Sequence, residues 1–225
     1  SPVVANHTQS AALLDDILKR VSRSFYVTIK AVPSSVRGQI GVAYLFARAA
    51  DTIADTDVIE RGSRLLLLKD FKAQFAGPDV DYSAIQSIQS MLVAHQATPG
   101  ERSLLGHLTE CFQLYERCSS ADRERLQRLM QTLINGMEMD LTVFPGDASR
   151  DVTSLATMED LDRYTYYVAG CVGEFWTAMT CAHLPSLAHW NVADMAQVGA
   201  RFGKGLQLTN IIKDLSRDLT RGRCY

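Results

Sequence analysis

The chain has 225 residues, 47% of them hydrophobic and 21% charged, with a formal net charge of −2 at pH 7. A chain of this size and composition can bury a substantial core without help from disulfides or metals. The small net charge argues against a nucleic-acid partner, because no dense Lys/Arg stripe is present to neutralise phosphates. The five cysteines are odd in number and lack metal-ligand spacing, so we interpret them as reduced packing residues.

Helical patterns follow one another along the chain. The first predicted helix covers residues 10–21, where Ser10 is a candidate N-cap. The second opens after Pro33 and runs to Asp55. Further helices are predicted at about 58–76, 82–95, 101–117, 121–143, 158–181 and 190–219, with breaks at GPD, TPG and FPGD. No stretch alternates with period two for long enough to predict a sheet, so the predicted fold class is all-α.

The sequence carries no pattern of membrane insertion or export. No apolar run approaches the ~20 residues that span a bilayer. The N-terminal SPVVANHTQS lacks the basic-then-apolar pattern of a signal peptide. We therefore expect a cytoplasmic protein without a transmembrane segment.

Two Asp-x-x-x-Asp pairs are the most informative feature of the chain: Asp51/Asp55 in RAADTIADT and Asp214/Asp218 in NIIKDLSRD. Residues four apart on a helix share a face, so each pair presents two carboxylates to one point. A solvated helix surface is the plain alternative. However, like charges at this spacing disfavour a helix unless a cation binds, and Asp51 lies in an apolar run. The pairs therefore predict a Mg²⁺ site that grips a diphosphate.

Each aspartate pair belongs to a longer polar stripe on an otherwise apolar helix. The stripes consist of Tyr44, Arg48, Asp51 and Asp55 in the first helix and of Gln207, Asn210, Asp214 and Asp218 in the second. A polar stripe of this kind usually lines a site. Two helices with the same arrangement predict one shared cavity.

Four separated motifs carry a resemblance to a known family. They are SRSFY at Ser22–Tyr26, YLFARAADTIAD at Tyr44–Asp55, YTYYVAGCVG at Tyr164–Gly173 and LQLTNIIKDLSRDLTRGRCY at Leu206–Tyr225. In order and spacing they resemble the squalene/phytoene synthase family, from near residue 10 to the last residue. The resemblance implies an all-α isoprenoid synthase fold, like that of class I terpenoid synthases, with a helical bundle around a central cavity.

The resemblance also implies an activity. This is the Mg²⁺-dependent head-to-head condensation of two prenyl diphosphates, with farnesyl diphosphate as the first candidate, through a cyclopropyl intermediate. The product, whether squalene, hydroxysqualene, dehydrosqualene or phytoene, stays open, and so do NADPH use and the oligomeric state. Prenyl diphosphates are the expected partners, and an apolar product leaves peripheral membrane contact open.

Individual residues take roles from the resemblance. Tyr164 matches a family tyrosine near the developing carbocation, where its ring faces a cation and its hydroxyl accepts a proton or steers diphosphate. Without the resemblance, close helix packing would better explain this segment, with Tyr164, Val168, Cys171 and Phe175 on one face. Arg23, by default a surface arginine, becomes a bidentate diphosphate ligand. Lys213 stands where many members have Arg, which keeps the charge but loses the planar fork.

The complete expected site has three overlapping groups. The catalytic group is Tyr164, Arg48, Asp51, Asp55, Asp214 and Asp218. The substrate-binding group is Ser22, Arg23, Tyr44, Arg48, Gln207, Asn210, Lys213, Arg221 and Arg223, and the metal ligands are Asp51, Asp55, Asn210, Asp214 and Asp218. A further segment, INGMEMDL, resembles a helix that borders the prenyl cavity; its Asp140 either faces that cavity or pairs locally.

Two other interpretations belong to different classes. A noncatalytic, assembly-factor-like relative would lack the aspartate pairs, so their presence argues against it. A class I terpene cyclase or chain-elongating prenyltransferase shares the metal chemistry but usually carries a denser Asp-Asp-x-x-Asp cluster. We expect residues 1–225 to form a single squalene/phytoene synthase-like helical domain, which lacks the C-terminal helices that relatives place after the second motif.

Overall fold

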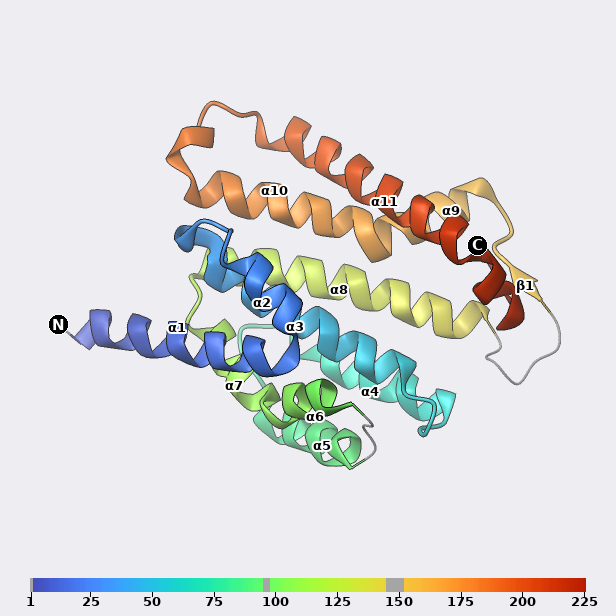
Figure 1. Cartoon of the computed structure of the whole chain (residues 1–225), viewed down its shortest axis with the longest axis horizontal. Helices are drawn as coiled ribbons and strands as arrows, with labels where there is room; N and C mark the ends of the chain where they lie inside the picture. Colours follow the sequence, from blue (N-terminus) through green and yellow to red (C-terminus); the bar gives the residue numbers. More distant parts are fainter. Residues whose placement is uncertain (1, 95–97, 145–151) are drawn as a thin grey trace. The chain divides into compact units, whose positions relative to one another are not determined.

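The computed structural model of the protein describes residues 2–94, 98–144 and 152–225, with side chains from residue 9 onward. Two sequence predictions fall outside these residues: the end, at His95, of the helix predicted over 82–95, and most of the FPGD break. Within the described residues helices dominate, which confirms the all-α prediction (Figure 1). None of these helices is long and apolar enough to cross a bilayer.

The chain divides into two compact units, residues 1–130 and residues 131–225. In the first unit, the described residues form seven complete helices and the beginning of an eighth. They are α1 (Pro2–Val21), α2 (Arg23–Ile29), α3 (Ser34–Asp55), α4 (Arg61–Ala73), α5 (Tyr82–Val93), α6 (Pro99–Gly106), α7 (Leu108–Glu116) and the N-terminal part of α8 (Ser120–Val143). The prediction of one domain over residues 1–225 stays a prediction.

Local chemistry explains where several of these helices begin. The hydroxyl of Ser22 accepts a hydrogen bond from the Phe25 amide and caps α2, a helix the sequence analysis did not predict. Asp81 and Thr98 cap α5 and α6 in the same way. The predicted cap at Ser10 is wrong, because α1 already begins at Pro2 and Ser10 lies inside it. The predicted helix over 101–117 is interrupted at His107.

The core of the first unit is built around α3, which packs against α1, α4, α6 and α7. An aromatic cluster fills this core, made of Phe46, Phe71, Phe75, Phe112 and Tyr115. The Phe46 ring centroid lies 4.6 Å from that of Phe112 and 5.0 Å from that of Phe75. Each fully buried aromatic side chain contributes roughly 1.5–3 kcal/mol, so α3 and its polar stripe are held on a rigid support.

The second unit is built from two long helical segments and a small strand pair. Its elements are the C-terminal part of α8, β1 (Thr153–Ser154), α9 (Met158–Thr165), the π-helix η1 (Tyr166–Gly170), α10 (Cys171–His183), the 3₁₀ turn η2 (Pro185–Leu187), α11 (Val192–Thr220) and β2 (Arg223–Cys224). The predicted helix over 158–181 is thus two helices joined by a π-turn. The parallel pair of β1 and β2 was not predicted, because two residues show no period.

Glycines allow α10 and α11 to pack closely along each other (Figure 1). A Cβ on Gly173 would lie 2.0 Å from the Gly199 carbonyl oxygen, and one on Gly203 would lie 2.4 Å from the Ala169 carbonyl oxygen. Neither position accepts a side chain without moving a backbone. Gly222 has φ 74° and turns the chain from α11 into β2, a conformation that favours glycine.

Candidate functional site

The first polar stripe lies on α3, as predicted. Asp51 is half-buried, and burial together with the charge of Asp55 raises the pKa of its carboxyl to about 6, against a smaller opposing effect of Arg48. A raised pKa means that a second negative charge on this face is costly. A bound cation would remove that cost, so the α3 pair is suited to a metal ion.

The neighbouring helix α2 contacts this stripe through aromatic stacking. The rings of Phe25 and Tyr44 are parallel within 6°, with centroids 3.5 Å apart. This contact places the SRSFY segment beside the stripe. Arg23 is exposed there, as a diphosphate ligand needs to be. The hydroxyl of Ser22 is engaged as the cap of α2, which leaves it less free for a substrate than predicted.

The second polar stripe lies on α11 of the other unit. Burial is the main cause that raises the pKa of Asp218, and the charge of Asp214 adds to it. The Asp214 carboxylate has a cationic partner of its own, because Arg217, three residues further along α11, donates to it at 3.0 Å. Asn210 and Lys213 are exposed on the same helix. Each stripe is therefore assembled by its own helix, and the meeting of the two in one cavity stays a prediction.

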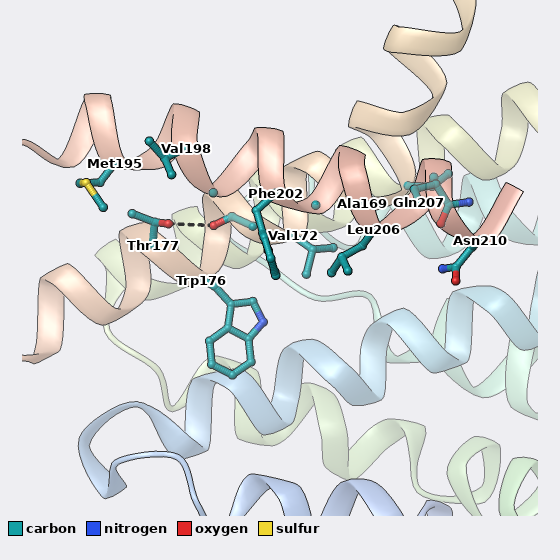
Figure 2. A pocket seen from close by; sticks show the side chains of 14 residues that line it. Ala169, Val172, Trp176, Thr177, Met195, Val198, Phe202, Leu206, Gln207 and Asn210 are labelled. Carbon is teal, nitrogen blue, oxygen red and sulfur yellow. Dashed lines mark hydrogen bonds between the residues drawn. The ribbon is translucent and has the colours of Figure 1, made fainter. Parts of the chain in front are cut away.

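A groove of about 720 Å³ runs between α11 and the segment formed by η1 and α10. Its walls are mainly apolar and include Val172, Trp176, Phe202 and Leu206 (Figure 2). Gln207 and Asn210 lie together at one end of it. The helix α11 continues from that end toward Asp214, which lies roughly 6 Å beyond Asn210 along the helix axis at 1.5 Å per residue. The groove thus leads from a stretch of apolar side chains toward the second carboxylate pair.

Tyr164 occupies the last turn of α9 and is 7% exposed. Its ring stacks on that of Tyr225, with centroids 4.7 Å apart and planes 21° from parallel. Burial, followed by the charges of Tyr225 and Asp140, raises its pKa. Of the four residues predicted to share one face, Tyr164, Cys171 and Phe175 are buried, whereas Val168 lines the groove. The π-helix η1 lies between Tyr164 and Cys171, and the common face of all four stays a prediction.

The two arginines after α11 differ in their surroundings. Arg221 is exposed at the C-terminal cap of the helix. Arg223 donates to Asp140 at 3.0 Å, and its guanidinium lies 5.9 Å from the Phe144 ring centroid. Arg221 is therefore the more accessible candidate for a diphosphate, whereas Arg223 is engaged in an ion pair. Asp140, for which the sequence left two interpretations, pairs with this segment.

The described residues contain no group of three or more His, Cys, Asp or Glu side chains arranged to hold a metal ion. Each aspartate pair is accordingly a set of two carboxylates. That number suits Mg²⁺, which is usually bound through one or two carboxylates and completes its shell with water and substrate phosphates.

Comparison with known proteins places these features in a family. The sequence model described as squalene/phytoene synthase matches residues 18–225. The chain belongs to this family. The squalene synthase of Saccharomyces cerevisiae is 28% identical over 93% of the chain and 44% of its own length. That of Eremothecium gossypii is 27% identical over 98% of the chain and 47% of its own length.

A bifunctional lycopene cyclase/phytoene synthase of Arthroderma gypseum is 26% identical over 93% of the chain and 33% of its own length. A solved structure of TcSQS in complex with a ligand has a TM-score of 0.69 at 28% identity, and covers 94% of this chain and 55% of its own. This likeness confirms the predicted squalene synthase-type helical fold. The chain spans about half the length of the curated squalene synthases it matches.

Sequence reasoning missed several residues that the fold brings together. Trp176 and Phe202 line the groove although they lie outside the four motifs, and Val172 lines it although it was given no role within the YTYYVAGCVG motif. The recurrence of Val198, Phe202 and Leu206 at helical spacing was the available signal. Tyr225 and Asp140 lie 85 residues apart, and nothing local in the sequence connects them.

Proposed function

We propose that the protein catalyses the Mg²⁺-dependent head-to-head condensation of two prenyl diphosphates through a cyclopropyl intermediate to a squalene-type or phytoene-type product. The observation that carries the proposal is the apolar groove on α11 that leads, through Gln207 and Asn210, toward the Asp214/Asp218 pair. A prenyl diphosphate has the same arrangement, since an apolar chain is followed by a charged diphosphate at one end.

Metal binding is assigned to the two aspartate pairs and Asn210. The raised pKa of Asp51, caused by burial and by Asp55, supports this assignment, because such a pair gains most from a cation. When bound, Mg²⁺ neutralises the charge that develops on a departing diphosphate.

The remaining residues bind and orient the substrate. Arg23, Arg48, Lys213 and Arg221 supply positive charge for phosphate oxygens, and Tyr44 and Gln207 supply neutral hydrogen-bond partners. The apolar walls of the groove, including Val172 and Phe202, are assigned to binding the apolar prenyl chain. Tyr164 is assigned a place beside that cation, where an aromatic ring stabilises positive charge.

The test is a product assay with the purified protein. It should be incubated with farnesyl or geranylgeranyl diphosphate, with and without Mg²⁺ and with and without NADPH. Release of diphosphate together with a C30 or C40 product, only when Mg²⁺ is present, is the expected result. The identity of the product decides among the squalene, hydroxysqualene, dehydrosqualene and phytoene outcomes. A cyclic product from one substrate molecule would instead support a terpene cyclase, and no diphosphate release would contradict the proposal.

A further inference from the structure

An arginine of the first unit connects α4 to the C-terminal end of α3. Arg64 Nη1 donates a hydrogen bond to the Ala54 carbonyl at 2.8 Å. Ala54 is 8% exposed and precedes Asp55, the last residue of α3. A buried carbonyl needs a hydrogen-bond partner, and the last four carbonyls of a helix have none within it. Arg64 therefore supplies, from another helix, a bond that α3 cannot form by itself.

Packing explains how this side chain reaches the end of α3. Residues 56–60 connect the two helices, so the first turn of α4 follows closely on the last turn of α3. Arg64 lies on the same face of α4 as Leu68 and Phe71, which follow it by one and two helical turns. Both of these side chains are fully buried, and Phe71 packs edge-on against Phe46 of α3. The core thus fixes the helix from which Arg64 reaches the Ala54 carbonyl.

The backbone at this end of α3 does not form a closing turn of its own. Thr56, directly after the helix, is extended with φ −72° and ψ 109°, whereas many helices end in a left-handed residue that helps to satisfy the last carbonyls. The last turn of a helix is also the part that frays first. Asp55 belongs to that turn, and it shares a face with Asp51 only while the turn stays helical.

Arg64 acts on this turn through the backbone. Burial and the charge of Asp55, opposed by Arg48, are the causes that shift the pKa of Asp51. Arg64 is not among these causes. Its Nε atom is buried and has no hydrogen-bond partner in the part of the chain that the structure describes, which carries a desolvation cost. The side chain is therefore not an exposed cation that turns freely toward a phosphate.

We propose that Arg64 is a positioning residue for the Asp51/Asp55 pair: by capping the end of α3 it holds Asp55 one helical turn from Asp51. This inference rests on the proposed function, in which these two carboxylates bind Mg²⁺. Two carboxylates on one face can bind one ion together, whereas a frayed last turn leaves Asp51 without its partner. Arg64 thus raises the affinity for the metal ion without contacting it.

The state of the last turn is tested by hydrogen exchange in the absence of Mg²⁺. Arg64→Met keeps an unbranched side chain but removes the donor, so the amides of residues 52–55 should exchange about fivefold faster. Arg64→Lys keeps a positively charged donor and should restore part of the protection. Lys69→Met is the matched control, because it removes one exposed positive charge from the same helix and should leave exchange unchanged. Equal protection of these amides in Arg64→Met and wild type would overturn the proposal.

Metal binding is tested by calorimetric titration with Mg²⁺ alone. In an Asp214→Asn/Asp218→Asn background, which keeps only the pair on α3, Arg64→Met should raise the dissociation constant of Mg²⁺ about fivefold. In an Asp51→Asn background, Arg64→Met should leave the dissociation constant unchanged, because the pair on α11 then binds the ion. An unchanged constant in the first background, or the same change in both backgrounds, would overturn the proposal.

The two measurements separate this inference from the proposed function. Faster exchange and weaker Mg²⁺ binding in Arg64→Met, in a protein whose wild type releases no diphosphate from farnesyl diphosphate, would contradict the proposed condensation alone. Diphosphate release by the wild type, with Arg64→Met binding Mg²⁺ as tightly as the protein that keeps Arg64, would overturn the inference alone. No Mg²⁺ binding by the background that keeps the pair on α3 would contradict the metal assignment and the inference together.

Discussion

The two aspartate pairs share one sequence pattern but lie in different physical environments. Asp51 and Asp55 project from α3, whose opposite face is buried against the aromatic cluster around Phe46. Asp214 and Asp218 project from α11, where Phe202 and Ile212 are 68% and 76% exposed. In the first pair, burial and the charge of Asp55 raise the pKa of Asp51 more than Arg48 lowers it, whereas Arg217 forms an ion pair with Asp214 in the second. The spacing of a motif therefore predicts which groups meet, but burial decides their charge state.

The largest expected effect comes from removing one carboxylate of either pair. Asp51→Asn or Asp214→Asn should reduce diphosphate release by at least about 100-fold, because each removes a charge assigned to metal binding. Circular dichroism should show an unchanged helical fold. Near wild-type turnover by either variant would contradict the assignment of that pair.

Stability as a function of pH should distinguish the two pairs. The pKa of Asp51 is about 6 in the folded protein against an ordinary 3.8, so its contribution to stability is fully present below about pH 4. It is lost as pH rises through 6, a change of up to about 3 kcal/mol in the free energy of unfolding. Asp51→Asn should therefore melt higher than wild type at pH 7 without Mg²⁺, although it is inactive.

Melting curves at pH 4 and pH 7 check this prediction, with Asp214→Asn as the control from the second pair. Asp214→Asn should not raise the melting temperature at pH 7, because it also loses the ion pair with Arg217. Mg²⁺ with farnesyl diphosphate should raise the melting temperature of the wild type at pH 7. Equal changes in melting temperature in the two variants would show that burial does not distinguish the two aspartate pairs.

The glycine contact between α10 and α11 permits a comparison on one helix. Gly199→Ala would place a Cβ 2.5 Å from the Gly173 carbonyl oxygen, which should destabilise the protein by about 1–3 kcal/mol. Gly205→Ala is the matched control, since its Cβ would meet no described heavy atom within 4 Å. It should stabilise α11 by up to about 1 kcal/mol. Thermal or urea unfolding of both variants measures the difference.

The smallest expected effect comes from Arg217, which partly neutralises the negative charge of the Asp214/Asp218 pair. Arg217→Gln removes an ion pair in which the arginine side chain is 62% exposed. Exposed pairs of this kind contribute about 0–1 kcal/mol, so the melting temperature should hardly change. Calorimetric titration with Mg²⁺ and a prenyl diphosphate should show equal or tighter binding. Clearly weaker binding would give Arg217 a direct role in holding the diphosphate.

The sequence predicted those parts of the protein that depend on local periodicity. The stripe from Tyr44 to Asp55 follows from helical spacing, and α3 confirms it. The helix α2 was missed because seven residues are too few to show a period. The contact of Asp140 with Tyr225 was missed because it depends on a strand pair of two residues and a glycine turn, neither of which has a strong local pattern.

The π-turn between α9 and α10 changes what a deletion in this part of the chain would do. A π-turn completes one turn with about one residue more than an α-turn. Deleting one residue between 166 and 170 would therefore allow a continuous α-helix in which α10 keeps its rotation relative to α9, with Val172 and Trp176 still on the groove side. Deleting one residue between Val172 and Trp176 would instead rotate the rest of α10 by about 100° and turn Trp176 away from the groove. The length of the chain is thus under a stricter structural constraint within α10 than in the π-turn.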